Sequence, residues 1–132
     1  MSQENVEIVR LMYDAWHRGD FETSLSYFDP EVEWIEPPDN PGGRTRHGHE
    51  GVAGAVSTWT GVFDDYRYEV RELIDLGDKV LLTAWHSGRG KTSGAPVSEE
   101  NFCVFTLRDG RIVKQEMFRQ RSQALEAVGL SE

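Results

Sequence analysis

Glu36 stands at the end of a short alternating segment, just before Pro37, and its side chain suits acid–base chemistry. Side chains alternate along a strand, so Val32, Trp34 and Glu36 share one face, and Pro37 cannot donate the next ladder hydrogen bond. If that face points inward, the carboxyl group lies in an aromatic pocket, where desolvation raises a carboxyl pKa toward the range of a general base. The alternative is that Trp34 belongs to the core and Glu36, at the end of the strand, meets water.

The histidines are further acid–base candidates, but their spacing does not indicate a metal site. His47 and His49 lie two residues apart in a predicted loop, and His17 and His86 are remote from them. No helical pair with metal-ligand spacing occurs, so we expect no metal. His86 lies in a segment that is apolar at both alternating positions, so parity does not decide whether its ring points inward as a second acid or base.

Other catalytic patterns are missing from the sequence. Residues 88–90 are glycine-rich but lack the Gly-Lys-Ser/Thr pattern of a phosphate loop. There is no nucleophile elbow, and the single cysteine, Cys103, lies in an apolar run that predicts a buried thiol. We therefore expect neither covalent catalysis nor a cofactor.

Composition and charge limit the class of protein. The chain has 132 residues, 38% of them hydrophobic and 28% charged, which is typical of one globular domain spanning 1–132. Its net charge of −9 disfavours nucleic acids and anionic membranes as partners. No signal peptide or membrane span is recognisable, so we expect a cytoplasmic protein. The 11% of aromatic residues can fill a core or line a cavity for a small apolar molecule.

The elements that must position these residues follow from apolar periodicity and turn signals. Apolar residues at helical spacing predict helices over residues 5–18 and 50–61, a short helix through Phe28 capped by Asp20, and a final helix from Ser122. Alternation predicts strands over 32–36, 66–76, 79–87, 98–107 and 111–119, with connections over 37–49 and 88–96. This order indicates an α+β fold: a cone-shaped, curved antiparallel sheet with helices packed on one face, enclosing a pocket.

Parity within the last strand selects its inward side chains. Val113, Gln115 and Met117 alternate with charged residues, so we expect them to point inward, and Arg119 shares their parity. Arg119 then either serves the pocket or pairs with a surface acid. In the loop over the pocket, Arg44, Arg46 and His47 either attract an anionic substrate or are simply solvated.

Several motifs resemble those of a known family. They are Tyr13-Asp14-Ala15-Trp16 with Gly19-Asp20-Phe21, Trp34-Ile35-Glu36-Pro37, Gly48-His49-Glu50-Gly51-Val52, and the segments 88–94, 108–113 and 124–130. The chain resembles the SnoaL-like branch of the nuclear transport factor 2-like superfamily, whose relatives include polyketide cyclases and ketosteroid isomerase. The resemblance covers essentially the whole chain and implies the cone-shaped α+β fold and a homodimer formed through the sheet face.

The resemblance also implies roles for single residues. Glu36 matches the aspartate before a proline that is the general base of ketosteroid isomerases. The first-helix tyrosine of those enzymes matches Met12, with Tyr13 one residue further on, and their protonated aspartate falls near Phe102 or Cys103. The acid of the polyketide cyclases falls in residues 117–119, which hold no carboxylate.

These observations lead to two hypotheses for the function. Either Glu36 is the general base of a cofactor-independent isomerase, lyase or hydrolase, or the same cavity belongs to a non-catalytic carrier of small molecules. The oxyanion donor of an enzyme would then be rebuilt, for instance from the amide of Asn101 or from Arg119. The predicted ligand-binding residues are Met12, Tyr13, Trp16, Trp34, Trp59, Phe63, Trp85, Asn101, Met117 and Arg119.

Overall fold

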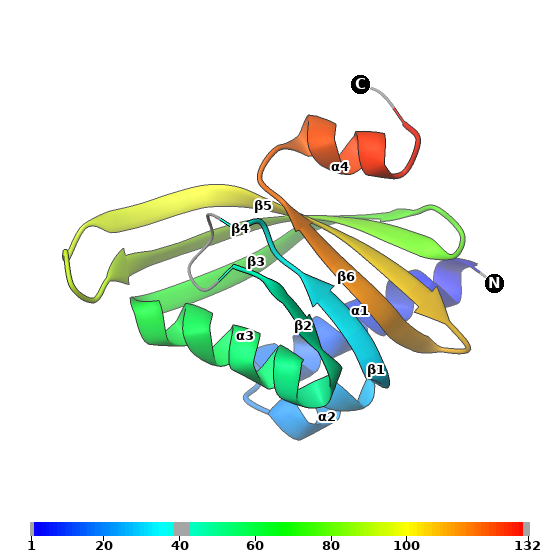
Figure 1. The fold of residues 1–132 in the computed structure, drawn as a ribbon, viewed down its shortest axis with the longest axis horizontal. Helices are drawn as coiled ribbons and strands as arrows, with labels where there is room; N and C mark the ends of the chain where they lie inside the picture. The colour runs from blue at the N-terminus through cyan, green and yellow to red at the C-terminus, as the bar shows by residue number, and fades with distance from the viewer. Residues whose placement is uncertain (1, 39–42, 131–132) are drawn as a thin grey trace.

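A computed structural model describes residues 2–38 and 43–130, and within them helices flank a single curved sheet of six strands (Figure 1). The predicted connection over 37–49 lies partly outside the described residues. The elements in chain order are α1 (Ser2–His17), α2 (Phe21–Ser26), β1 (Phe28–Ile35), β2 (Thr45–His47), α3 (Gly48–Val62), β3 (Phe63–Asp75), β4 (Lys79–Gly90), β5 (Pro96–Arg108), β6 (Arg111–Phe118) and α4 (Arg121–Ala127). No helix in this part of the chain is long and apolar enough to cross a membrane.

The first helices form where periodicity and capping predict them. Val9 and Met12 of α1 are buried at helical spacing, and Gly19 then takes a left-handed conformation that ends the helix. Asp20 caps α2 by accepting a hydrogen bond from the Thr23 backbone N–H at 3.2 Å. The prediction that α2 reaches Phe28 is wrong, because Phe28 is the first residue of β1.

The sheet has the order β2-β1-β6-β5-β4-β3. The strands β3 to β6 form the predicted antiparallel meander, but β1 runs parallel to β6, so the sheet is mixed. Tight turns fix the directions within the meander, whereas β1 and β6 are far apart in sequence and no local signal fixes theirs. The short strand β2, which pairs with β1, was predicted to be loop.

Helices cover both faces of the sheet, in contrast to the prediction of one face. The helices α1 and α3 pack over the face that carries Val80, Leu82 and Phe105, where the main core lies. The short helix α4 lies on the opposite face (Figure 1), where Ala124 and Leu125 form a second cluster with Leu81, Phe102 and Val104. Because neighbouring residues of β4 and β5 point to opposite faces, the two clusters use alternate positions of the same strands.

Irregularities in strand register change which side chains face the main core, and one of them lies in β6. In β6 the pairs are Leu107 with Ile112 and Thr106 with Lys114, so Val113 is an extra residue. Ile112 is therefore fully buried and Val113 is only partly buried, which contradicts the predicted parity, while Gln115 and Met117 point inward as expected.

A second bulge interrupts β3. Its strand pairs Asp64 with Arg89 but Arg67 with Ser87, and Asp65 between them has a positive φ of 53°. In a regular strand, Tyr66 and Tyr68 would point to the face opposite Phe63. After the bulge they point to the same face as Phe63, toward the helices α1 and α3.

Candidate functional site

An apolar cavity lies between the sheet and the layer formed by α1, α2 and α3. Its free volume is about 60 Å³, which is room for a few water molecules or one small group with the side chains as they stand. The lining is formed by Met12, Tyr13, Trp16, Phe21, Ser24, Phe28, Trp34, Val52, Val56, Trp59, Tyr66, Tyr68, Gln115 and Met117.

Stacked aromatic rings separate this cavity from solvent. The ring of Tyr13 stacks on that of Tyr68 with centroids 5.2 Å apart, and the Trp16 ring meets Tyr68 edge-on at 5.9 Å. Together with Tyr66 these residues also line an open groove of about 800 Å³ between α1 and β3. The cavity is therefore reached from the groove by rotating one or two aromatic side chains, and a larger ligand would extend into the groove.

Two buried polar atoms in the cavity wall lack hydrogen-bond partners among the described residues. They are the indole Nε1 of Trp34 and the amide Oε1 of Gln115. These residues are register partners on the neighbouring strands β1 and β6, so their side chains lie side by side. The other amide atom of Gln115, Nε2, lies 3.8 Å from the sulfur of Cys103, to which it donates. One donor and one acceptor on neighbouring strands of the cavity wall are thus left without partners, an arrangement that costs free energy unless a ligand or water fills it.

Glu36, which the sequence leaves either buried or solvated, is buried just after β1, with 1% of its side chain exposed. Its Oε2 accepts a hydrogen bond from the Trp59 indole at 2.8 Å, and its Oε1 lies 4.0 Å from Nε of Arg46. Glu36 is not part of the cavity lining, because the Trp59 ring lies in that wall. Arg46, predicted to lie in a loop over the pocket, is instead a partly buried residue of β2, with 10% of its side chain exposed, and it provides a counter-charge for this carboxylate.

A chain of hydroxyl and amide groups runs along the sheet side of the cavity. Tyr13 Oη lies 3.4 Å from Tyr68 Oη, and the Asn101 carbonyl oxygen accepts from Tyr68 at 2.9 Å and from the Cys103 thiol at 3.3 Å. Burial raises the pKa of Tyr13 and of Tyr68 well above the usual range, and it raises the pKa of Cys103 to about 12. All three groups remain protonated donors at neutral pH, so Cys103 is the inert buried thiol that the sequence predicts.

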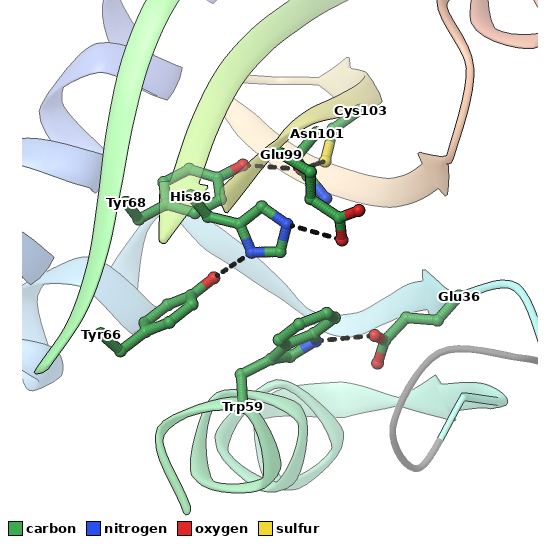
Figure 2. A network of polar contacts seen from close by, with 8 residues as sticks. All are labelled: Glu36, Trp59, Tyr66, Tyr68, His86, Glu99, Asn101 and Cys103. Atoms are coloured by element: carbon green, nitrogen blue, oxygen red, sulfur yellow. Dashed lines mark hydrogen bonds and ion pairs between the residues drawn. The ribbon is translucent and has the colours of Figure 1, made fainter. Parts of the chain in front are cut away.

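His86, whose orientation the sequence leaves open, points toward the cavity side of the sheet (Figure 2). Its Nδ1 lies 3.1 Å from Tyr66 Oη and its Nε2 lies 3.2 Å from a carboxylate oxygen of Glu99. Its ring meets Trp59 edge-on at 5.3 Å. Burial lowers the pKa of His86, and the neighbouring Glu99 opposes part of that effect. The imidazole is therefore held neutral, with a hydrogen-bond partner on each nitrogen.

The remaining predicted residues lie apart from the cavity. Phe63 stacks on Trp59 and Tyr66 from outside the lining. Trp85 is on the opposite face of the sheet, where Arg71 lies over its ring at 5.0 Å. Arg119 is exposed and lines a separate polar pocket of about 70 Å³ beside His86 and Glu99.

The other histidines are distributed over the surface of the fold. The ring of His17 bonds to the Tyr68 carbonyl at 2.7 Å, and that of His49 to the Phe28 carbonyl at 2.9 Å. His47 lies 3.8 Å from the carboxylate of Glu33. Within residues 2–38 and 43–130, no cluster of three or more acidic, histidine or cysteine side chains could hold a metal ion.

Sequence reasoning did not select Tyr66, Tyr68, Glu99 or Gln115 as site residues. Gln115 carries a recognisable signal, since it is a polar residue on an inward apolar stripe. The inward direction of Tyr66 depends on the bulge at Asp65, which periodicity does not reveal.

Comparisons with known proteins agree with this architecture. The family model described as SnoaL-like domain matches residues 9–115. The comparison with curated proteins gives no match.

Several solved structures share the fold over nearly the whole chain. TerC, co-crystallised with polyporic acid, is 25% identical with a TM-score of 0.75, over 96% of this chain and 98% of that one. An NTF2-like protein from Burkholderia thailandensis is 26% identical with a TM-score of 0.81, over 90% and 95% of the two chains. A putative SnoaL-like polyketide cyclase from Jannaschia sp. is 21% identical with a TM-score of 0.75, over 98% and 94%, and at that identity it supports the fold alone.

Proposed function

Because this chain belongs to the SnoaL-like domain family, whose fold hosts both enzymes and binders, we propose that its cavity binds a small, uncharged ring compound that carries one hydrogen-bonding oxygen. The conclusion rests on the two unpartnered atoms on neighbouring strands, Trp34 Nε1 and Gln115 Oε1. A hydroxyl group satisfies both atoms, because it accepts from the indole and donates to the amide oxygen. A ketone satisfies only the indole.

The apolar walls and the available space support the uncharged, small character of the ligand. An ionised group in this cavity would lose its hydration without a counter-charge, because the partly buried Arg46 is already placed beside Glu36. A single or fused ring is larger than the free volume of about 60 Å³, so its binding requires Tyr13 or Trp16 to move and places part of the ligand in the groove.

We propose further that the bound compound is converted by cofactor-independent proton transfer, as in an isomerase, lyase or hydrolase. A general base must reach the substrate within hydrogen-bond distance. Glu36 reaches the cavity only if Trp59 moves aside, so in this arrangement it serves to hold the Trp59 wall in place. The alternative function, a carrier that binds without conversion, is favoured because none of the described residues that line the cavity carries a carboxylate.

Titration calorimetry with three matched bicyclic compounds tests the binding proposal. 2-Naphthol offers both a donor and an acceptor, 2-tetralone offers an acceptor only, and tetralin offers neither. We expect affinity to fall in that order, by about fivefold to a hundredfold at each step, because each unsatisfied buried group costs ~1–3 kcal/mol. The variants Trp34→Phe and Gln115→Leu should each reduce the difference. Equal affinity for all three compounds, or no binding of any, would refute the proposal.

Product analysis of each compound that binds separates the enzyme from the carrier. Conversion of any ligand, detected by mass spectrometry after incubation, supports the enzyme. Tight binding with unchanged ligands across steroid, polyketide and terpenoid collections supports the carrier.

We also propose that two copies pair through the sheet face that α4 only partly covers. Leu81, Phe102 and Val104 on this face are covered by α4, whereas Trp85 lies outside that cluster and is only partly buried. An apolar ring at such a position gives a second copy a contact point.

A further inference from the structure

We infer that Tyr66, His86 and Glu99 form a proton relay that connects the cavity to solvent. Tyr66 lines the cavity, His86 is 2% exposed, and the side chain of Glu99 is 51% exposed. The three side chains are joined by hydrogen bonds of 3.1 and 3.2 Å (Figure 2). The inference rests on the proposed function, since it describes the chemistry of the same cavity.

The strand register explains why these side chains meet. His86 on β4 pairs with Glu99 on β5 on one side and with Tyr68 on β3 on the other. The bulge at Asp65 then turns Tyr66 to the same face, two residues before Tyr68. Tyr66 therefore reaches across to the imidazole while its ring remains in the cavity wall, in contact with Trp59 at 6.2 Å.

The chemistry of the partners gives the relay a direction. An ionised Glu99 only accepts hydrogen bonds, so the facing Nε2 of His86 carries the proton. Nδ1 then has a free lone pair and accepts from the Tyr66 hydroxyl. In this arrangement the carboxylate orients the imidazole, and the imidazole polarises the hydroxyl group. Such a set of residues is recognised by its geometry, whatever the order of its members along the chain.

The electrostatic surroundings keep the relay in its resting form. Burial raises the pKa of Tyr66, so its hydroxyl group remains protonated, and burial lowers the pKa of His86, so its ring remains neutral. Among the described residues, the ionisable groups around His86 are Tyr66 and Tyr68 on β3, Glu99 and Glu100 on β5, and Arg119 after β6. The uncharged ring of Trp59 on α3 also packs against His86.

The relay removes a proton from a carbon beside a carbonyl group by two coupled proton transfers. The C–H bond of the ligand breaks, its proton passes to Tyr66 Oη, and its electron pair forms the enolate. The Tyr66 hydroxyl proton passes to Nδ1 of His86, which becomes an imidazolium beside the Glu99 carboxylate. Return of the proton, to the same carbon or to another one, restores every group, so no oxidant or reductant is needed. Tyr66 is the catalytic residue, while His86 and Glu99 act through it.

Hydrogen–deuterium exchange of 2-tetralone in D₂O tests this step, with mass spectrometry as the readout and calorimetry as a parallel measure of binding. We expect the wild-type protein to accelerate exchange, with a rate that rises with pH as His86 becomes neutral. Tyr66→Phe should lower the rate by about a hundredfold or more without loss of binding. Glu99→Gln should lower it by about tenfold and move the pH profile to lower values, because Glu99 raises the pKa of His86. The matched controls are Tyr27→Phe and Glu31→Gln, which lie outside the cavity lining.

Nitrogen-detected NMR of His86 in the ligand-free protein tests the relay independently of any ligand. The relay requires a neutral ring protonated on Nε2 at pH 7 and a titration midpoint that falls in Glu99→Gln. A proton on Nδ1 or an unchanged midpoint would overturn the relay whatever 2-tetralone does. Binding of 2-tetralone without accelerated exchange would also overturn it, and so would variants that exchange as fast as their controls. Failure of all three compounds, 2-tetralone included, to bind refutes the proposed function instead, and whenever 2-tetralone does not bind the NMR result decides the relay.

Discussion

Replacing Trp59 by phenylalanine is the sharpest test of how the cavity wall is held. The substitution keeps an aromatic ring that can still stack on Phe63 and Tyr66, whose centroids lie 5.9 and 6.2 Å from that of Trp59. It removes the indole N–H that donates to Oε2 of Glu36 at 2.8 Å. A buried carboxylate oxygen is thereby left without its partner.

The expected loss of stability is about 3 kcal/mol. A buried hydrogen bond to a charged group contributes ~1.5–3 kcal/mol when its partner is removed. The smaller ring buries less apolar surface, which adds about 1 kcal/mol. For a chain of this length the sum corresponds to a fall in Tm of roughly 10 °C. Arg46, beside the same carboxylate, remains in place and limits the loss.

Urea denaturation followed by circular dichroism measures the effect without relying on tryptophan fluorescence. Trp85→Phe is the matched control, because Trp85 is only partly buried and contacts Arg71 through its ring face, so we expect a loss below about 1 kcal/mol. A double-mutant cycle with Glu36→Gln should give a coupling energy of at least about 1 kcal/mol. Equal losses for Trp59→Phe and Trp85→Phe, together with a coupling near zero, would refute the conclusion that Glu36 anchors the wall.

Three further predictions concern the rest of the fold. The pKa of His86 is lowered in the folded state, so its contribution to stability is complete above pH ~6.5 and is lost as the pH falls below that value. Urea unfolding at pH 7.5 and 5.0 should show a smaller acid loss in His86→Gln, and an equal loss would contradict the prediction. Gly88→Ala should cost about 1–3 kcal/mol, because the new Cβ would lie 3.0 Å from Cβ of Phe63, whereas Gly61→Ala meets no atom within 4 Å; thermal melts compare them. Light scattering should show a dimer that Trp85→Glu dissociates, and a wild-type monomer at micromolar concentration would contradict the proposed pairing.

The fold was predictable where a local pattern determines the structure. The alternation of Val32, Trp34 and Glu36 predicted that these side chains share one face, and that face is buried, while Asp20 marked the start of α2. The parallel pairing of β1 with β6 was not predictable, because it depends on contacts between distant segments and no turn encodes it.

The candidate site was predictable only in part, for a similar reason. Helical spacing together with the family resemblance led to Met12, Tyr13 and Trp16, which all reach the cavity. The bulge at Asp65 adds one residue to β3 and so redirects Tyr66, and a periodic pattern carries no record of such an insertion. Arg46 was assigned to a loop because a strand of only three residues is too short to show alternation.

The two acid–base candidates lie on different sides of the same indole, and this separation assigns them different roles. Trp59 donates to Glu36 through Nε1 and presents its ring to His86 at 5.3 Å. Glu36 already has a hydrogen-bond donor and a neighbouring cation, so its charge is balanced where it stands and it has no direct access to the cavity. His86 is neutral, reaches the cavity through Tyr66, and exchanges protons with solvent through Glu99. A proton abstracted in the cavity therefore has a connected path toward His86, while Glu36 fixes the ring that separates them.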